Sequence, residues 1–336
     1  MNDGVAPAQP VRHRDTSVNG WSAVHLSNDR IDLTVVPGKG ADITSLRDRA
    51  TETELLWSTR WGLRPPTALA PPGNPEAEAL DRSGGGWHTL FPNAGRQCVE
   101  QGVEWGFHGE AWLAPYESEP TAGGLHLRTT LARSPFTVVK DIVLDGDRVS
   151  VTETVTQIGA HPVDVMWWQH PTFGAPLIGP DTTVSVTDCA VHPDMPDDVP
   201  DTRQPPRGPE HRPPRAERVD LSRLTAAGAG VSRLAFLGGF AAEQVRAEIR
   251  NPALGLGVDV EWLAGDFPYA CYWYEAGGRL GYPWYGATHG FSIEPATGYP
   301  SGLARARALT GTEVTLQPGE TMSKTVSVRV VSLPMR

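Results

Sequence analysis

The chain has 336 residues, of which 39% are hydrophobic and 20% are charged, and this composition is typical of a folded globular protein. Its formal net charge is −10 at pH 7 and no block of lysine or arginine offsets it, so we expect neither nucleic acid nor an anionic membrane as a partner. The N-terminus lacks the apolar stretch of a secretory signal, and no apolar run reaches the roughly 18 residues that indicate a membrane span. We therefore expect a cytoplasmic protein.

Apolar and polar residues alternate with a period of two along much of the chain, which indicates β-strands. In chain order, strands are expected over residues 31–36, 125–131, 136–144, 148–157 and 183–187. An Asp-Gly pair separates the third of these from the fourth. Such a pair between two strand-like segments is a strong signal of a hairpin.

Two more hairpins are expected in the second half of the chain. Residues 247–250 and 258–262 flank an Asn-Pro turn, and residues 313–316 and 324–331 flank a Pro-Gly turn. Many hairpins with few helices predict an all-β fold. A large antiparallel β-sandwich is expected, because a two-sheet arrangement manages the strand edges.

A single domain that spans residues 1–336 is expected. A short helix is expected near residues 75–82. Two proline-rich segments, residues 64–75 and 192–214, are expected as surface loops, because proline cannot donate to a sheet ladder. Residues 1–25 are expected to form an N-terminal extension.

Chemistry is expected at four clusters where polar and aromatic residues interrupt the strand pattern. The clusters are Gly84–Arg96, Trp105–Trp112, Met166–Gly174 and His289–Gly298. Each places a protic side chain beside glycine, proline or aromatic residues. Glycine permits close approach of the backbone to a ligand, and aromatic side chains exclude water and so shift the pKa of a nearby group. A histidine and a glutamate in such a setting can act as an acid and a base near neutral pH.

Each candidate side chain also has a purely structural interpretation. His108 and His170 could be buried histidines with satisfied hydrogen bonds, Glu294 could be a turn residue before proline, and Arg96 could form a surface ion pair. The hypothesis of a site therefore depends on the four clusters together. The three cysteines include no Cys-x-x-Cys pair, so reduced thiols and no metal site are expected.

In this order the clusters resemble the aldose 1-epimerase family, also called galactose mutarotases. Gln169–Gly174 is similar to the family's histidine-proline-x-phenylalanine signature, Phe107–Gly109 to its other histidine-glycine site, and Ser292–Pro295 to its late glutamate strand. The segment 40–57 resembles the family's early strand pair. The likeness extends over about residues 30–331.

The resemblance implies the antiparallel supersandwich of the galactose mutarotase type and an isomerase that interconverts the α and β anomers of a free aldose. Glu294 would match the general base that takes the proton from the C1 hydroxyl. His170 would match the general acid that protonates the ring oxygen. The ring would open, the C1–C2 bond would rotate, and the ring would close from the other face. No redox step arises, so no cofactor is expected.

The resemblance also implies residues that bind the sugar. His108 and Arg96 would match residues that hydrogen-bond it, and Asn93 and Trp168 are further candidate contacts. The family usually has an arginine directly after an asparagine in the first cluster, whereas Ala94 follows Asn93 here. No residue matches the acidic side chain that reads sugar hydroxyls in galactose-acting members.

Other functions remain open at this point. A hexose-6-phosphate 1-epimerase would share the fold but needs arginines for the phosphate, and Glu110 stands where that branch tends to carry an arginine. A non-catalytic carbohydrate-binding module would also use aromatic side chains, but it would not explain Glu294 together with two histidines. A glycoside hydrolase usually needs two carboxylates, and only one is a good candidate. The expected partner is a small-molecule sugar, and the chain could be a monomer or a homodimer.

Overall fold

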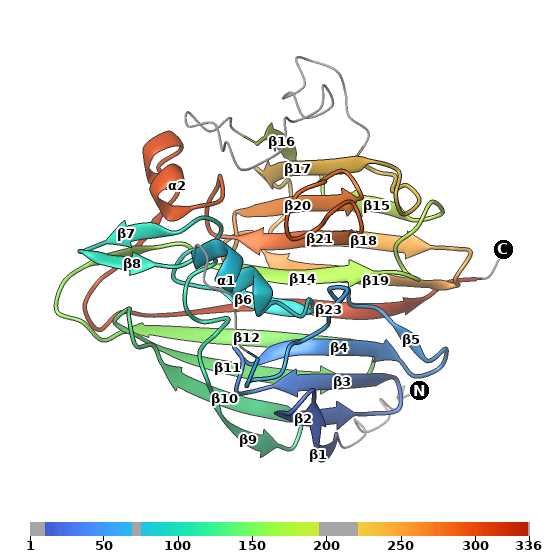
Figure 1. Cartoon of the computed structure of the whole chain (residues 1–336), viewed down its shortest axis with the longest axis horizontal. Coiled ribbons are helices and arrows are strands. Elements are labelled where there is room, and N and C mark those ends of the chain that lie inside the picture. The colour runs from blue at the N-terminus through green and yellow to red at the C-terminus, as the bar shows by residue number, and fades with distance from the viewer. Residues whose placement is uncertain (1–10, 69–74, 195–220, 335–336) are drawn as a thin grey trace, which may run out of the picture.

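The computed structural model describes residues 11–68, 75–194 and 221–334, and these residues form an antiparallel β-sandwich. Two large sheets share one hydrophobic core (Figure 1). The predicted fold class is therefore confirmed. Within the described ranges, no helix is long and apolar enough to cross a membrane.

The larger sheet has eleven strands. One of them, β5 (Thr53–Glu54), pairs only with β4 (Asp42–Asp48) and lies outside the main order. From one edge to the other, the sheet runs through β1 (Arg12–Val18), β2 (Trp21–Ser27), β3 (Ile31–Val36), β4 (Asp42–Asp48), β6 (Trp87–Leu90), β14 (Trp168–Gly174), β21 (His289–Ala296), β20 (Tyr269–Ala276), β17 (Val231–Gly238) and β16 (Ala190–Pro193).

The second sheet has eight strands and completes the sandwich. Its order is β15 (Thr183–Val186), β18 (Gln244–Asn251), β19 (Leu256–Leu263), β23 (Thr321–Ser332), β12 (Arg148–Gln157), β11 (Phe136–Asp145), β10 (Gly124–Thr130) and β9 (Glu117–Thr121). Smaller elements lie outside both sheets: the strand pairs β7 (Cys98–Glu100) with β8 (Val103–Trp105) and β13 (Val163–Val165) with β22 (Val314–Leu316), and the helices α1 (Pro75–Asp81) and α2 (Leu303–Leu309).

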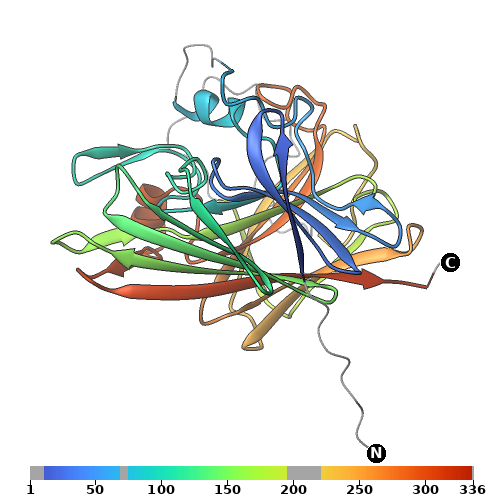
Figure 2. The ribbon, with the colours of Figure 1, turned by 90° about the horizontal axis from the view of Figure 1, so that it is seen from below.

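Alternation along the strands explains how the sheets pack. Every second residue of β11 and β12 is buried, so each strand turns one face to the core and one to solvent. In β19, by contrast, all residues except the last are buried. The blue N-terminal strands lie against the green strands of the second sheet in both views (Figures 1 and 2), and His13 there hydrogen-bonds the Gly124 carbonyl.

The hairpin predictions have mixed outcomes. The Asp-Gly turn joins β11 to β12 and the Asn-Pro turn joins β18 to β19, as expected. The third predicted hairpin is wrong, because β22 pairs with β13 whereas β23 lies between β12 and β19. The long β23 carries buried Val326, Val328 and Val330, so it gains more from the centre of a sheet than from a three-residue neighbour.

The remaining segments also differ in part from expectation. The short helix expected near residues 75–82 is α1. Residues 12–25, expected within an N-terminal extension, belong to the first two strands of the large sheet. Their polar alternation hides the strand signal, because β1 is an edge strand with mostly exposed side chains. Most of the proline-rich segment 192–214 lies outside the described residues, although its first two residues pair in β16.

Candidate active site

The register of the large sheet places four polar side chains in one row on a single face. His88 of β6 lies opposite His170 of β14. The pairing of β14 with β21 sets His170 opposite Glu294. Asp42 of β4 continues the row beyond His88, with Oδ2 2.9 Å from Nδ1 of that histidine. Strands that lie far apart in the chain therefore bring two of the predicted site residues together.

His170 and Glu294 form the centre of this row. Nε2 of His170 lies 3.3 Å from Oε1 of Glu294, and the two side chains are 18% and 4% exposed. Nδ1 of His170 lies 2.9 Å from Oγ1 of Thr172, and Oγ of Ser292 is 3.4 Å away. These contacts hold the imidazole in place, and its side chain stays partly exposed.

Burial dominates the acid–base properties of this pair. It lowers the pKa of His170 to about 3, with a smaller contribution from His88, and raises the pKa of Glu294 well above its ordinary value, although the neighbouring Ser292 opposes that rise. Both shifts favour the neutral forms, in which the pair carries one proton. A carboxyl and an imidazole that share one proton can deliver a proton and accept another without a change of net charge.

The loop after β8 carries His108 to the same place. The backbone N–H of Gly95 donates to His108 Nδ1 at 3.0 Å, so in the neutral ring Nε2 carries the hydrogen. The ring centroids of His108 and His170 are 5.9 Å apart, and burial lowers the pKa of His108 well below its usual value. Gly109 is required beside it, because φ is 76° and a Cβ atom would lie 2.5 Å from the carbonyl oxygen of Phe91.

Asn93 and Arg96 lie on the neighbouring loop. Asn93 is fully buried: its Nδ2 donates to the carbonyl oxygens of Arg96 and Gly106 at 2.7 and 3.3 Å, and its Oδ1 accepts from the N–H of Leu303. Its polar atoms therefore hold the loop in shape. The half-buried Arg96 belongs to the turn whose Gly95 binds His108, so a sugar contact by Arg96 stays a prediction.

Trp168 is 2% exposed and packs edge-on against Phe236, with ring centroids 6.0 Å apart. It offers no open ring face for stacking. Three half-exposed tryptophans, which we call the tryptophan group, lie on the other side of His170: Trp57, Trp273 and Trp284. The ring centroid of Trp273 is 6.5 Å from that of His170, and Trp273 contacts the other two. The chain has eleven tryptophans, and sequence alone cannot say which of them stay accessible for stacking.

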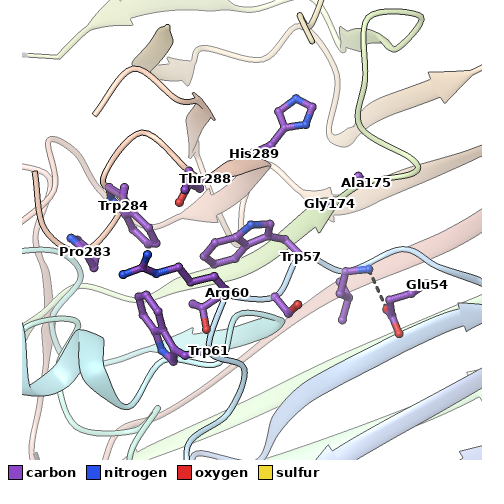
Figure 3. A pocket seen from close by; sticks show the side chains of 14 residues that line it. Glu54, Trp57, Arg60, Trp61, Gly174, Ala175, Pro283, Trp284, Thr288 and His289 are labelled. Atoms are coloured by element: carbon purple, nitrogen blue, oxygen red, sulfur yellow. Dashed lines mark hydrogen bonds between the residues drawn. The ribbon is translucent and has the colours of Figure 1, made fainter. Parts of the chain in front are cut away.

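Trp57 and Trp284 also line a cavity of about 310 Å³ (Figure 3). Arg60 and Trp61 close one side of it, and neither His170 nor Glu294 lines it. This volume is at the lower end of the range of about 300–1,000 Å³ for small-molecule sites. The acid–base pair therefore lies on a separate part of the face, beside the tryptophan group.

Sequence reasoning missed the buried ions behind His88. Nζ of Lys39 lies 2.5 Å from Asp42 Oδ2 and 4.4 Å from the Trp112 ring centroid. Burial raises the pKa of Asp42, but His88 and Lys39 outweigh it and hold that pKa below its ordinary value. Burial lowers the pKa of both Lys39 and His88. The available signal was a Lys-Gly-Ala-Asp turn between apolar strands.

Glu110 has a structural role that differs from the sequence argument. Its carboxylate accepts hydrogen bonds from the backbone N–H groups of residues 132–134 and from the Ser134 hydroxyl. The carboxylate therefore holds the loop of residues 132–134 in place. Within the part of the chain that the structure describes, no group of three or more His, Cys, Asp or Glu side chains is arranged to hold a metal ion.

Solved structures with the same fold include several sugar-related proteins. A candidate aldose 1-epimerase from Klebsiella pneumoniae is 13% identical, with a TM-score of 0.73 over 98% of this chain and 85% of that chain. A galactose mutarotase related enzyme from Lactobacillus acidophilus is 16% identical, with a TM-score of 0.65 over 92% and 97%. A galactose mutarotase-like protein from Clostridium acetobutylicum is 12% identical, with a TM-score of 0.65 over 96% and 99%. At these identities the likeness shows the galactose mutarotase-like fold.

No curated protein matches the sequence. One family model matches residues 123–330, which is more than half of the chain and includes His170 and Glu294 but neither His88 nor His108. The chain belongs to the family described as Domain of unknown function (DUF4432).

Proposed function

We propose that this protein is an aldose 1-epimerase, a mutarotase that interconverts the α and β anomers of a free aldose. The observation that carries the proposal is the 3.3 Å contact between Nε2 of His170 and Oε1 of Glu294 on a partly open sheet face. The names of the structural neighbours support the same class of reaction. His108, whose ring lies beside His170, adds a hydrogen-bond donor for the sugar.

The chemistry follows from the one proton that the pair carries. With Glu294 as carboxylate and His170 as imidazolium, Glu294 takes the proton of the C1 hydroxyl while His170 delivers its proton to the ring oxygen. The bond between C1 and the ring oxygen breaks and C1 becomes an aldehyde carbon. Rotation about C1–C2 and the reverse proton transfers then form the other anomer.

Burial determines where the proton of the pair lies before and after this step. Burial favours the neutral forms, which are protonated Glu294 and neutral His170. The pair therefore reaches its reactive form when the proton moves from Glu294 to His170 across their 3.3 Å contact, and ring opening returns the pair to the neutral forms. The reaction moves no electrons to or from an external group, so it requires no redox cofactor.

Polarimetry of freshly dissolved α-glucose and α-galactose tests the proposal. Wild-type protein should accelerate the approach to anomeric equilibrium over buffer alone. The Glu294→Gln and His170→Gln variants should each lose at least ~10²-fold in rate, because each removes one proton-transfer group. Urea unfolding checks that both variants fold.

His126→Gln is the matched control for these variants. His126 pairs with Asp141 on the second sheet, whereas the row lies on the larger sheet, and its side chain is substantially exposed. This variant should keep the wild-type rate. Sugar binding without any acceleration by the wild type would overturn the enzymatic proposal and indicate a carbohydrate-binding module.

A further inference from the structure

His88 is the one imidazole of the row that the proposed reaction leaves without a role. It is 6% exposed, and the two groups behind it, Asp42 and Lys39, are 1% and 2% exposed. Lys39 supplies the positive charge that makes a buried Asp42 carboxylate tolerable. A buried ion pair directly behind an active-site imidazole has a clear physical consequence for that ring, because it acts on one of the two nitrogens.

Asp42 determines which nitrogen of His88 carries the hydrogen. Its Oδ2 is 2.9 Å from Nδ1 of His88, although the contact is not a linear hydrogen bond. A lone pair on Nδ1 would face the carboxylate oxygen and be repelled by it. Nδ1 is therefore protonated. Burial, with a smaller contribution from Lys39, outweighs the Asp42 carboxylate and lowers the pKa of His88, so a second proton is disfavoured and Nε2 presents a lone pair.

Nε2 of His88 faces the site rather than the core. Among the described residues, no protein group hydrogen-bonds this nitrogen, and it is not sealed from solvent as Nδ1 is. Its ring centroid is 6.2 Å from that of His170 and 5.7 Å from the Trp112 ring. His108 lies at similar distances from the same two rings but presents Nε2–H. The site therefore combines one acceptor imidazole with one donor imidazole.

The order of the row suggests what the acceptor binds. Glu294, His170 and His88 follow one another across three neighbouring strands. In an aldopyranose the C1 hydroxyl, the ring oxygen and the C5 substituent also follow one another. A sugar with its C1 hydroxyl at Glu294 and its ring oxygen at His170 directs the C5 substituent toward His88.

We propose that Nε2 of His88 accepts a hydrogen bond from the 6-hydroxyl of an aldohexose, so that the preferred substrate is a hexose with a free 6-hydroxyl. This inference rests on the proposed roles of His170 and Glu294. Pentoses and 6-deoxyhexoses lack the donor. A 6-phosphate also lacks it at neutral pH and would set anionic oxygens against the lone pair.

Substrate selectivity tests this inference directly. Wild-type kcat/KM should be at least about tenfold higher for galactose than for 6-deoxygalactose, because the analogue leaves Nε2 without a donor. Glucose should be preferred over xylose and glucose 6-phosphate for the same reason. In His88→Asn the preference for galactose over its 6-deoxy analogue should fall toward one, whereas the control His126→Asn should keep it. Equal kcat/KM values for the two sugars in the wild type would overturn the inference.

A measurement without substrate separates this inference from the proposed reaction. Nitrogen-15 NMR of the full chain at neutral pH should find Nε2 unprotonated in His88 and protonated in His108. A protonated Nε2 in His88 would overturn the inference even if mutarotation is fast. If no aldose is turned over, calorimetry still compares the affinities for galactose and 6-deoxygalactose, and equal affinity or binding of neither sugar would also overturn it.

Discussion

Two buried glutamates lie against opposite faces of β6 and β14, and their surroundings differ. Glu153 of β12 contacts the face that packs on the second sheet. It accepts hydrogen bonds from Thr89, from Trp167 Nε1 at 2.9 Å and from Gln169 Nε2 at 2.6 Å, and Lys140 Nζ lies 3.2 Å away. Its charge is thus fully compensated between the sheets, and no ligand can reach it.

Glu294 faces the other way and has fewer partners. It has the imidazole of His170 at 3.3 Å, and burial raises its pKa well above the ordinary value. Successive residues of a strand point to opposite faces of the sheet. The strands therefore carry a fully hydrogen-bonded cluster around Glu153 on one face and the His170–Glu294 pair on the other. The comparison teaches that pairing, rather than burial alone, decides which carboxyl group is available for chemistry.

Removal of the saturated glutamate should have the largest effect on folding. Glu153→Ala should lower the free energy of unfolding by about 3–5 kcal/mol, because Lys140 is left buried without its carboxylate. Urea unfolding measures this loss. Glu119→Ala, at an exposed position in β9, is the control and should change stability by less than about 0.5 kcal/mol. A loss below about 1 kcal/mol in Glu153→Ala would show that the two glutamates do not differ as described.

The reactive glutamate should instead reveal itself through pH. Because its pKa is raised from 4.5 in the fold, its stabilising contribution is complete below pH 4.5 and is lost as the pH rises toward the raised pKa. The free energy of unfolding of the wild type minus that of Glu294→Gln should therefore fall by up to about 1.4 kcal/mol per pH unit over that window. Urea unfolding from pH 4 upward provides the measurement, and a difference independent of pH would contradict it.

The smallest effect is expected at a carboxylate that serves only the backbone. Glu110→Gln should cost about 1 kcal/mol of stability, because a neutral amide cannot accept all the hydrogen bonds from residues 132–134. The rate of mutarotation should not change. Polarimetry measures the rate and urea unfolding measures the stability. A large loss of rate in this variant would show that Glu110 serves the reaction, as Glu294 does, rather than the fold, as Glu153 does.

Local patterns were sufficient for part of the fold and for the main candidates. Alternation over residues 136–144 and 148–157 and the Asp-Gly turn between them predicted β11 and β12 to within one residue, because a tight hairpin depends on neighbouring residues alone. The partners of β22 and β23 were not predictable in this way. A turn between two strands does not require them to pair when other strands offer larger buried surfaces.

The same division applies to the candidate site. The sequence by itself determined the strand-forming segments, the all-β class and the candidacy of His108, His170 and Glu294, since each follows from a short motif. Only the tertiary structure decided that Asp42 and His88 join the row, that Asn93 and Trp168 are buried, and that Glu153 and Glu294 face opposite ways. Cross-strand register and burial arise from contacts between residues that are far apart in the chain, so no local pattern contains them.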